Sequence, residues 1–130
     1  CCKGNEGFGP KKQTCDTKKG NQSLKYSPSN SADRINDRVE CLPNGKLFSK
    51  ESDFNNDINK VLNLNLPRLV SNRSVVIESI QKKLNSSKGS ITKPKLQNLI
   101  TGLSSKNTEN KFQPFYGVKV QYLRKKLKKA

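Results

Sequence analysis

The apolar residues of this sequence recur in short periodic segments that are separated by polar linkers. Only 31% of the 130 residues are hydrophobic, and there is no Trp and no Met. A chain of this length usually forms one domain or part of one, and so little apolar surface allows only a modest core. We therefore expect a core that is built in pieces and a fold that relies on a partner.

A large positive charge dominates the long-range behaviour of the chain. Lys and Arg number 26 against 10 Asp and Glu, which gives a formal net charge of +16. Phosphate backbones are attracted to such a chain, because basic side chains release the condensed counterions that they replace. Nucleic acid is therefore the favoured partner, and a soluble basic surface without a ligand is the alternative.

What the sequence lacks excludes several classes of protein. It contains no His, so no Ser-His, Cys-His or His-metal hydrolytic site can be assembled from this chain alone. No apolar run approaches the roughly 18 residues that a membrane span needs, and no secretory signal pattern is present. We expect a cytoplasmic protein with no membrane partner.

The four cysteines are Cys1, Cys2, Cys15 and Cys41. Their even number permits disulfides, but three crowd one end of the chain, unlike the dispersed framework of a small secreted domain. Cys2 and Cys15 flank a glycine-rich loop, and they would supply two of the four ligands of a tetrahedral zinc site. The loop is longer than a Cys-x-x-Cys knuckle, so ordinary thiols remain the alternative.

The first 50 residues predict little regular structure. A glycine-rich loop at 1–13 precedes a short polar helix that begins at Cys15 and ends at Gly20. Residues 21–37 form a connection rich in Ser and Asn. Asn44-Gly45 between two short segments predicts a β-hairpin, because Asn-Gly supplies the positive φ angles of a tight turn.

Four helices are predicted after residue 50. Apolar residues recur there at helical spacing, and Ser or Pro stands where three of the helices begin. The expected helices run from Ser52 to near Asn65, from Pro67 to about Leu84, from Pro94 to Leu103, and from Val118 into the basic end. The expected fold class is α+β and predominantly helical.

Several motifs occur in an order that is typical of one family. They are Cys2-Lys-Gly4-Asn-Glu-Gly7, Gln13-Thr-Cys15-Asp16-Thr-Lys18-Lys19-Gly20-Asn21, Asn44-Gly45-Lys46, Leu62-Asn63-Leu64-Asn65 with Leu69 and Asn72-Arg73, and Phe115 with Tyr122-Leu123-Arg124-Lys125-Lys126-Leu127. Together they resemble a family of HNH endonucleases from bacterial anti-phage systems. Septu nuclease subunits and HNH relatives encoded beside retrons are the most similar groups, and the resemblance covers nearly the whole chain.

The resemblance implies a division of the chain. Residues 1–37 would be the end of a zinc-stapled ββα-metal motif and its linker, and residues 38–130 a hairpin with a helical C-terminal extension. An earlier Cys-x-x-Cys pair would complete a structural zinc site with Cys2 and Cys15. An earlier histidine would activate water beside a catalytic divalent cation such as Mg²⁺. The chain would then be the carboxy-terminal portion of a DNA endonuclease and inactive alone, with an ATPase subunit and retron components as partners.

Candidate site residues follow from these motifs. Asp16 is the expected catalytic residue, as a metal-binding or orienting group, and a carboxylate favoured by the helix dipole is the alternative. DNA contacts are expected at Lys18, Lys19, Arg124, Lys125 and Lys126, for which solvated helix faces are the alternative. Structural roles are expected at Asn65, Asn72 and Arg73.

Two other classes of function remain open. A non-catalytic basic nucleic-acid-binding protein fits the charge and the lack of His, and a secreted disulfide protein fits the even number of cysteines. The sequence before Cys1 in the parent gene separates the first of these from a nuclease. A Cys-x-x-Cys followed by Glu-His would support the nuclease, and a start codon immediately before Cys1 would oppose it.

Overall fold

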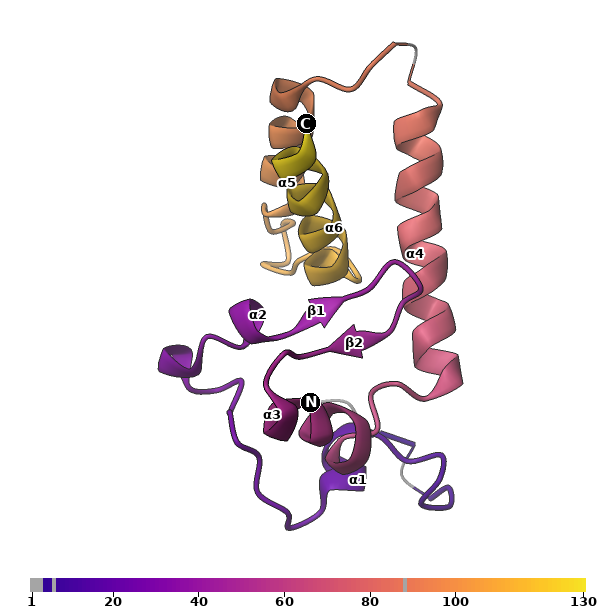
Figure 1. The fold of residues 1–130 in the computed structure, drawn as a ribbon, viewed down its shortest axis with the longest axis vertical. Helices are drawn as coiled ribbons and strands as arrows, with labels where there is room; N and C mark the ends of the chain where they lie inside the picture. The colour runs from indigo at the N-terminus through magenta and orange to yellow at the C-terminus, as the bar shows by residue number, and fades with distance from the viewer. Residues whose placement is uncertain (1–3, 6, 88) are drawn as a thin grey trace. The chain divides into compact units, whose positions relative to one another are not determined.

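The chain forms two compact units, residues 1–71 and 72–130 (Figure 1). The computed structural model describes residues 4–5, 7–87 and 89–130. In this described part of the chain, no helix has the length and apolar content that a membrane crossing requires. The fold is α+β and mostly helical, with one two-stranded antiparallel sheet, as predicted. The functional division expected at residue 37 stays a prediction.

The first unit consists of short elements. In chain order they are α1 (Cys15–Lys19), the 3-10 turn η1 (Ser31–Asp33), α2 (Ile35–Arg38), β1 (Glu40–Cys41), β2 (Leu47–Phe48), α3 (Ser52–Asn56) and the π-helical turn η2 (Asp57–Val61). The end of α1 at Gly20 confirms the prediction, because Gly20 follows the helix with φ 53°.

The hairpin of β1 and β2 confirms the predicted position but not the predicted turn. Glu40 pairs with Phe48 and Cys41 with Leu47. Gly45 has φ 88°, whereas Asn44 is not among the residues with positive φ. The N–H of Gly45 donates to the carbonyl of Leu42 over 2.9 Å. This is a three-residue loop in which Pro43 begins the turn and glycine alone takes the left-handed position.

The helix predicted from Ser52 is shorter than expected and changes its winding. Phe54, Ile58 and Val61 of its expected apolar face are buried, whereas Leu62, the fourth residue expected on that face, is half-buried and follows the helical run. Glu51, not Ser52, occupies the N-cap, and η2 continues α3 with wider turns. The helical run ends before residue 65, because Asn63 adopts a left-handed φ of 51°, a conformation that Asn tolerates better than most residues.

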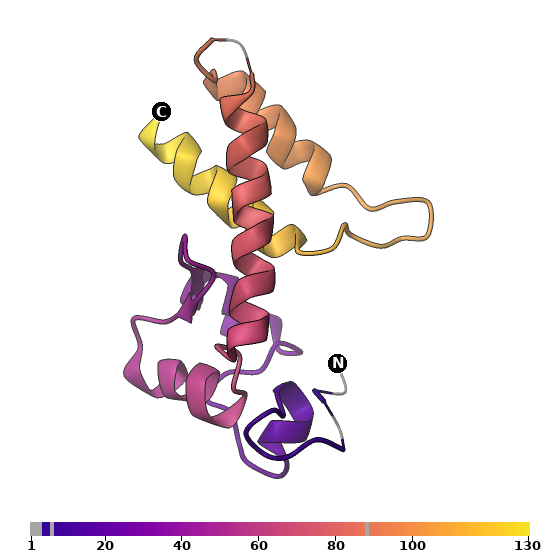
Figure 2. The same cartoon turned by 90° about the vertical axis from the view of Figure 1, so that its right-hand side faces the viewer.

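Three helices form the second unit: α4 (Pro67–Asn85), α5 (Lys93–Leu103) and α6 (Tyr116–Lys129). Part of α4 precedes the boundary at residue 72. The three helices bury one apolar cluster, and α5 packs along α6 (Figure 2). The members of this cluster are Ile80, Leu84, Leu96, Ile100, Val120 and Leu123. All three helices were predicted, and α6 begins two residues before the expected start.

The two leucines of α5 provide a test of this core. Leu96 is 3% exposed, whereas Leu99 on the same helix is 41% exposed. We expect Leu96→Ala to lower the free energy of unfolding by about 2–5 kcal/mol, because it leaves a cavity. Leu99→Ala should cost less than about 1 kcal/mol. Urea unfolding followed by circular dichroism measures both, and equal losses would contradict the core assignment.

Candidate functional site

A closed loop places Cys15 at the start of α1. The N–H of Thr14 donates to the carbonyl of Gly4 over 2.9 Å, so the two ends of the loop lie side by side. Gly4 has φ 57°, and a Cβ atom there would collide with the carbonyl oxygen of Thr14. Only glycine therefore fits this position. One end of the loop is two residues after Cys2, and the other end precedes Cys15 directly.

Side chains cross the loop and reinforce it. The Asn5 amide donates to the carbonyl of Lys12 over 2.7 Å, and the Gln13 amide donates to the carbonyl of Phe8 over 2.7 Å. These bonds satisfy backbone carbonyls in a segment whose described residues, 4–5 and 7–14, belong to no helix or strand. The loop is thus held by polar contacts rather than by an apolar core.

The first half of the Leu-Asn-Leu-Asn motif fastens this loop from outside. The N–H of Cys15 donates to the carbonyl of Leu62 over 2.8 Å. The Asn63 amide donates to the carbonyls of Gln13 (3.0 Å) and Lys11 (3.3 Å). Because these contacts span about 50 residues of sequence, they fix α1 against the end of η2. The sequence motif suggested a turn here but not this contact.

The residues of α1 have different surroundings. Cys15 is half-buried, not in a disulfide, and has φ 54°. Asp16 is exposed in the first turn. The ammonium of Lys18 donates to the carbonyl of Pro10 over 3.2 Å, and that of Lys19 donates to the carbonyl of Gly20 over 2.9 Å. Both lysines are therefore partly engaged with the chain itself.

Of the two expected zinc ligands in this chain, the structure describes Cys15 but not Cys2. Among residues 4–5, 7–87 and 89–130, no group of three or more His, Cys, Asp or Glu side chains is placed to hold a metal ion. Cys1 and Cys2 lie outside the described residues. Cys41 is half-buried on β1 and belongs to the hairpin. The zinc ligands Cys2 and Cys15 and the catalytic cation at Asp16 stay predictions.

Asn65 joins the end of the motif to the hairpin. Its Oδ1 accepts from the N–H of Leu47 over 2.7 Å, and its Nδ2 donates to the carbonyl of Leu47 over 2.8 Å. The side-chain amide thus bonds both polar groups of one residue in β2, as a neighbouring strand would. Asn72 is exposed on α4, and Arg73 beside it is buried.

The basic residues predicted to contact DNA are divided between the two units. Lys18 and Lys19 belong to the first unit, and Arg124, Lys125 and Lys126 belong to α6 in the second. Arg124 and Lys126 are exposed and Lys125 is half-buried.

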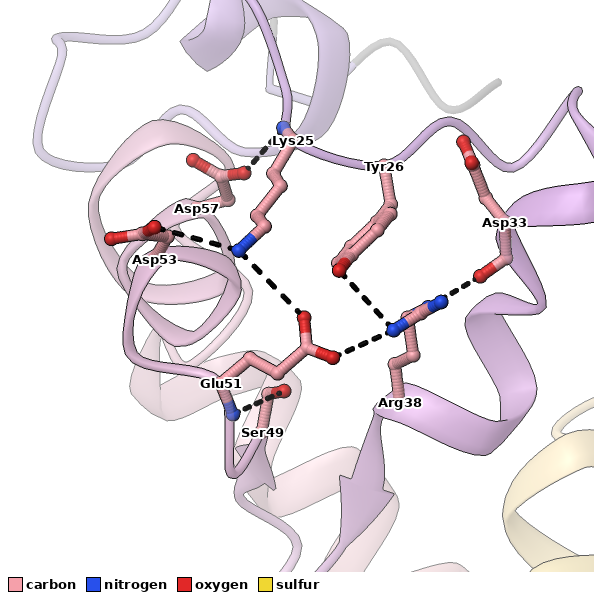
Figure 3. Close-up of polar contacts among 8 residues, drawn as sticks. All are labelled: Lys25, Tyr26, Asp33, Arg38, Ser49, Glu51, Asp53 and Asp57. Carbon is pink, nitrogen blue, oxygen red and sulfur yellow. Dashed lines mark hydrogen bonds and ion pairs between the residues drawn. The ribbon is translucent and has the colours of Figure 1, made fainter.

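A polar cluster around Tyr26 was not foreseen from the sequence (Figure 3). The Arg38 guanidinium lies 4.1 Å from the centre of the Tyr26 ring, and Phe54 meets that ring edge-on with centroids 5.2 Å apart. Arg38 also donates to Glu51 over 2.6 Å and to the Tyr26 hydroxyl over 3.2 Å. Residues 21–37, which the sequence indicated only as a connection, are thereby attached to the start of α3.

Lys25 and Asp57 extend this attachment. The backbone N–H of Lys25 donates to the Asp57 carboxylate over 2.8 Å, and the Lys25 ammonium lies 3.5 Å from Asp53. Asp57 is buried on the same face as Phe54 and Ile58. A carboxylate on the apolar face of a predicted helix was the one sequence signal for this contact.

The electrostatics of the cluster favour a structural role. A hydrogen bond from the Tyr26 hydroxyl, together with the charge of Arg38, lowers the pKa of Glu51 below its usual value of 4.5. The same hydrogen bond, with burial, raises the pKa of Tyr26 above 10.0. Each group is therefore held in the protonation state that suits its partner, and neither is poised to exchange protons near neutral pH.

Comparison with known proteins found no matching family model, no matching curated protein and no matching solved structure.

The cluster predicts a dependence of stability on pH. Because its folded pKa is lowered, Glu51 contributes stability above the unfolded value of 4.5, and this is lost as pH falls through the folded value. We expect the urea midpoint of the native chain to fall further between pH 6 and pH 3 than that of Glu51→Gln. Glu109→Gln, which changes a carboxylate of the second unit, should behave like the native chain. Parallel curves for Glu51→Gln and the native chain would refute this assignment.

The amide of Asn65 provides a second test. Asn65→Ala removes both bonds to Leu47, and we expect the free energy of unfolding to fall by about 1–3 kcal/mol. Asn56→Ala changes an exposed residue of α3 and should cost less than about 0.5 kcal/mol. Hydrogen exchange at the amide of Leu47 measures the local effect, and unchanged protection in Asn65→Ala would argue against the contact.

Proposed function

We propose that this chain is the carboxy-terminal portion of a metal-dependent HNH DNA endonuclease of an anti-phage system. The observation that carries the proposal is the closed loop between the two expected zinc ligands. The bond between Gly4 and Thr14 closes the loop at a residue two positions after Cys2 in the sequence and at the residue before Cys15, and a metal ion bound by both cysteines would need such a closed loop between them. The loop stands at the start of α1, and Leu62 and Asn63 hold it there.

In this proposal the residues of the chain hold the site rather than cut. Zinc bound by Cys2, Cys15 and two further cysteines would fix the loop to α1. Asp16 is exposed in the first turn of α1, where its carboxylate is free to bind or orient a divalent cation such as Mg²⁺. The chain contains no His, so the group that activates water would come from a preceding segment of the longer protein.

The second unit supports the expected partners. Residues 72–130 carry 14 of the 26 Lys and Arg but only 2 of the 10 Asp and Glu. Such a charge distribution attracts DNA. Apolar side chains of the same unit are exposed, namely Val75, Leu99, Phe112 and Phe115. In the proposal they dock the ATPase subunit that controls cleavage, and retron components in those systems that contain them.

The charge of the second unit also favours a second candidate, a non-catalytic nucleic-acid-binding protein. Binding through residues 72–130 needs neither zinc nor a catalytic group. The two candidates differ in cleavage, because a structural zinc at Cys15 fits either one, whereas only the endonuclease hydrolyses DNA with a divalent cation.

Zinc content and DNA cleavage by the longer protein test the proposal. We expect Cys15→Ser to lose one zinc per chain and to lower Mg²⁺-dependent cleavage by at least about 10-fold, since the metal fixes the site geometry. Cys41→Ser, which changes another half-buried cysteine, should keep both. Asp16→Asn should lower cleavage and keep the zinc. Mass spectrometry of bound metal and a plasmid-cleavage assay measure these outcomes.

A glycine pair supplies the matched control for the loop. Gly4→Ala should lose zinc, because its Cβ meets the carbonyl of Thr14, whereas Gly9→Ala has open space around it and should keep zinc. The endonuclease proposal fails if the longer protein binds DNA without cutting it and Cys15→Ser changes neither property. That result would favour the non-catalytic candidate.

A further inference from the structure

A cleft of about 900 Å³ lies within the second unit. Its walls are the end of α4, residues 87 and 89–91, the first turn of α5 at Leu96 and the last turns of α6. From α6 it receives Tyr122, Lys126 and Lys129. These positions are four and three residues apart, so they share one face of the helix.

This spacing divides the basic end of the chain into two faces. Lys126 and Lys129 line the cleft, whereas Arg124 and Lys128 do not, and both of these are exposed. The ammonium of Lys126 lies 5.9 Å from the centre of the Tyr122 ring. Two basic groups and an aromatic ring therefore meet in the cleft, and two further basic groups nearby in the sequence stay outside it.

The charged side chains among the described residues that line the cleft are all positive. None of the described residues that line it is acidic. The acidic residues of the sequence from 72 to 130 are Glu78 and Glu109. Glu109 forms an ion pair with Lys111 over 3.1 Å. An anion in the cleft thus meets the two ammonium groups of Lys126 and Lys129 and no carboxylate side chain in the wall. Ala130 also lines the cleft, and in the 130-residue chain its single α-carboxylate opposes these two positive charges.

The remaining wall is suited to something less polar than phosphate. Half-buried Ile91 contributes apolar surface above the core residues Leu84 and Leu96, and Gln81 and Asn85 contribute amides. A DNA duplex presents phosphates outward and keeps its bases stacked inside, so it would gain little from an apolar wall. A single strand exposes both its phosphates and its bases, and such strands bind where basic and aromatic side chains adjoin.

We propose that this cleft binds a single strand of nucleic acid. Lys126 and Lys129 contact consecutive phosphates, and a base lies against the half-buried side chains of Tyr122 and Ile91. The amides of Gln81 and Asn85 bond the edge of that base. A volume of about 900 Å³ is within the range of ligand sites and admits one or two nucleotides. The site deepens the proposed function and rests on it, since it assigns a strand-binding role to residues of the second unit.

Two double variants of equal charge test the site. Fluorescence anisotropy of the 130-residue chain with labelled oligothymidine measures the dissociation constant over a range of salt concentrations. We expect Lys126→Ala with Lys129→Ala to weaken binding by about 10-fold or more and to lower the salt slope by about 1.4, the value for two phosphate contacts on a single strand. Arg124→Ala with Lys128→Ala should weaken binding less than about 3-fold, because neither residue reaches the cleft.

The aromatic contact has its own variants. Tyr122→Leu should weaken binding about 10-fold, and Tyr122→Phe should keep it, since stacking needs the ring and not the hydroxyl. Thermal unfolding of each variant shows whether the helix core is intact. If Tyr122→Leu unfolds, the comparison of the Lys126 and Lys129 double variant with the Arg124 and Lys128 double variant still tests whether the cleft binds the strand.

Three outcomes would overturn the proposal. Equal losses from the two double variants would show that the charge acts diffusely. Tighter binding of a duplex than of a single strand of the same sequence would show that no base enters the cleft. Displacement of the strand by polyglutamate, lost in the Lys126 and Lys129 variant alone, would assign the cleft to an acidic protein segment. Anisotropy reports binding only, so each of these failures is distinct from a failure of zinc binding or cleavage in the longer protein.

Discussion

Backbone groups in the first unit are bonded by side-chain amides and carboxylates because too few apolar residues are present to fold them into longer helices and strands. Asn63 bonds the loop before Cys15, Asn65 bonds β2, and Asp57 bonds the N–H of Lys25. Each of these bonds joins segments that are distant in sequence. Buried or half-buried polar groups without partners are costly, so the unit depends on every one of these side chains being in place.

The second unit is held together mainly by apolar packing rather than by side-chain hydrogen bonds to the backbone. Its six-residue apolar cluster draws on α4, α5 and α6, and the charged residues of this unit are mostly basic, 14 Lys and Arg against 2 Glu. Like charges at close spacing on α6 repel one another in the free chain. A polyanion bound at α6 would reduce this repulsion in addition to making its own contacts with the helix. Binding at the proposed site would therefore also stabilise α6.

The sequence predicted the helices and turns, which depend on neighbouring residues, but not the contacts between residues that are distant in the chain. Apolar residues at helical spacing identified α4, α5 and α6. Gly20 identified the end of α1, and Gly45 identified the turn between β1 and β2. Local pattern also placed Cys15 and Asp16 at the start of α1. The contacts of Tyr26 with Arg38 and Glu51, and those of Asn63 with the loop, join residues that no periodicity relates, so only three-dimensional coordinates could reveal them. The π-helical turn η2 was also not predictable from the apolar pattern, because it buries the same residues that an α-helix would bury.

The basic end of the chain shows how the structure changes the meaning of a sequence pattern. Read along the chain, Arg124, Lys125 and Lys126 form one uniform block. Wound into α6, that block and the two lysines after it separate by face, and only Lys126 and Lys129 stand beside Tyr122 in the cleft. Charge alone brings any polyanion to this surface, but a wall that is basic, aromatic and apolar at once distinguishes between polyanions. In the proposed site, selectivity among polyanions would therefore depend on the helical spacing of these residues more than on the number of charges in the unit.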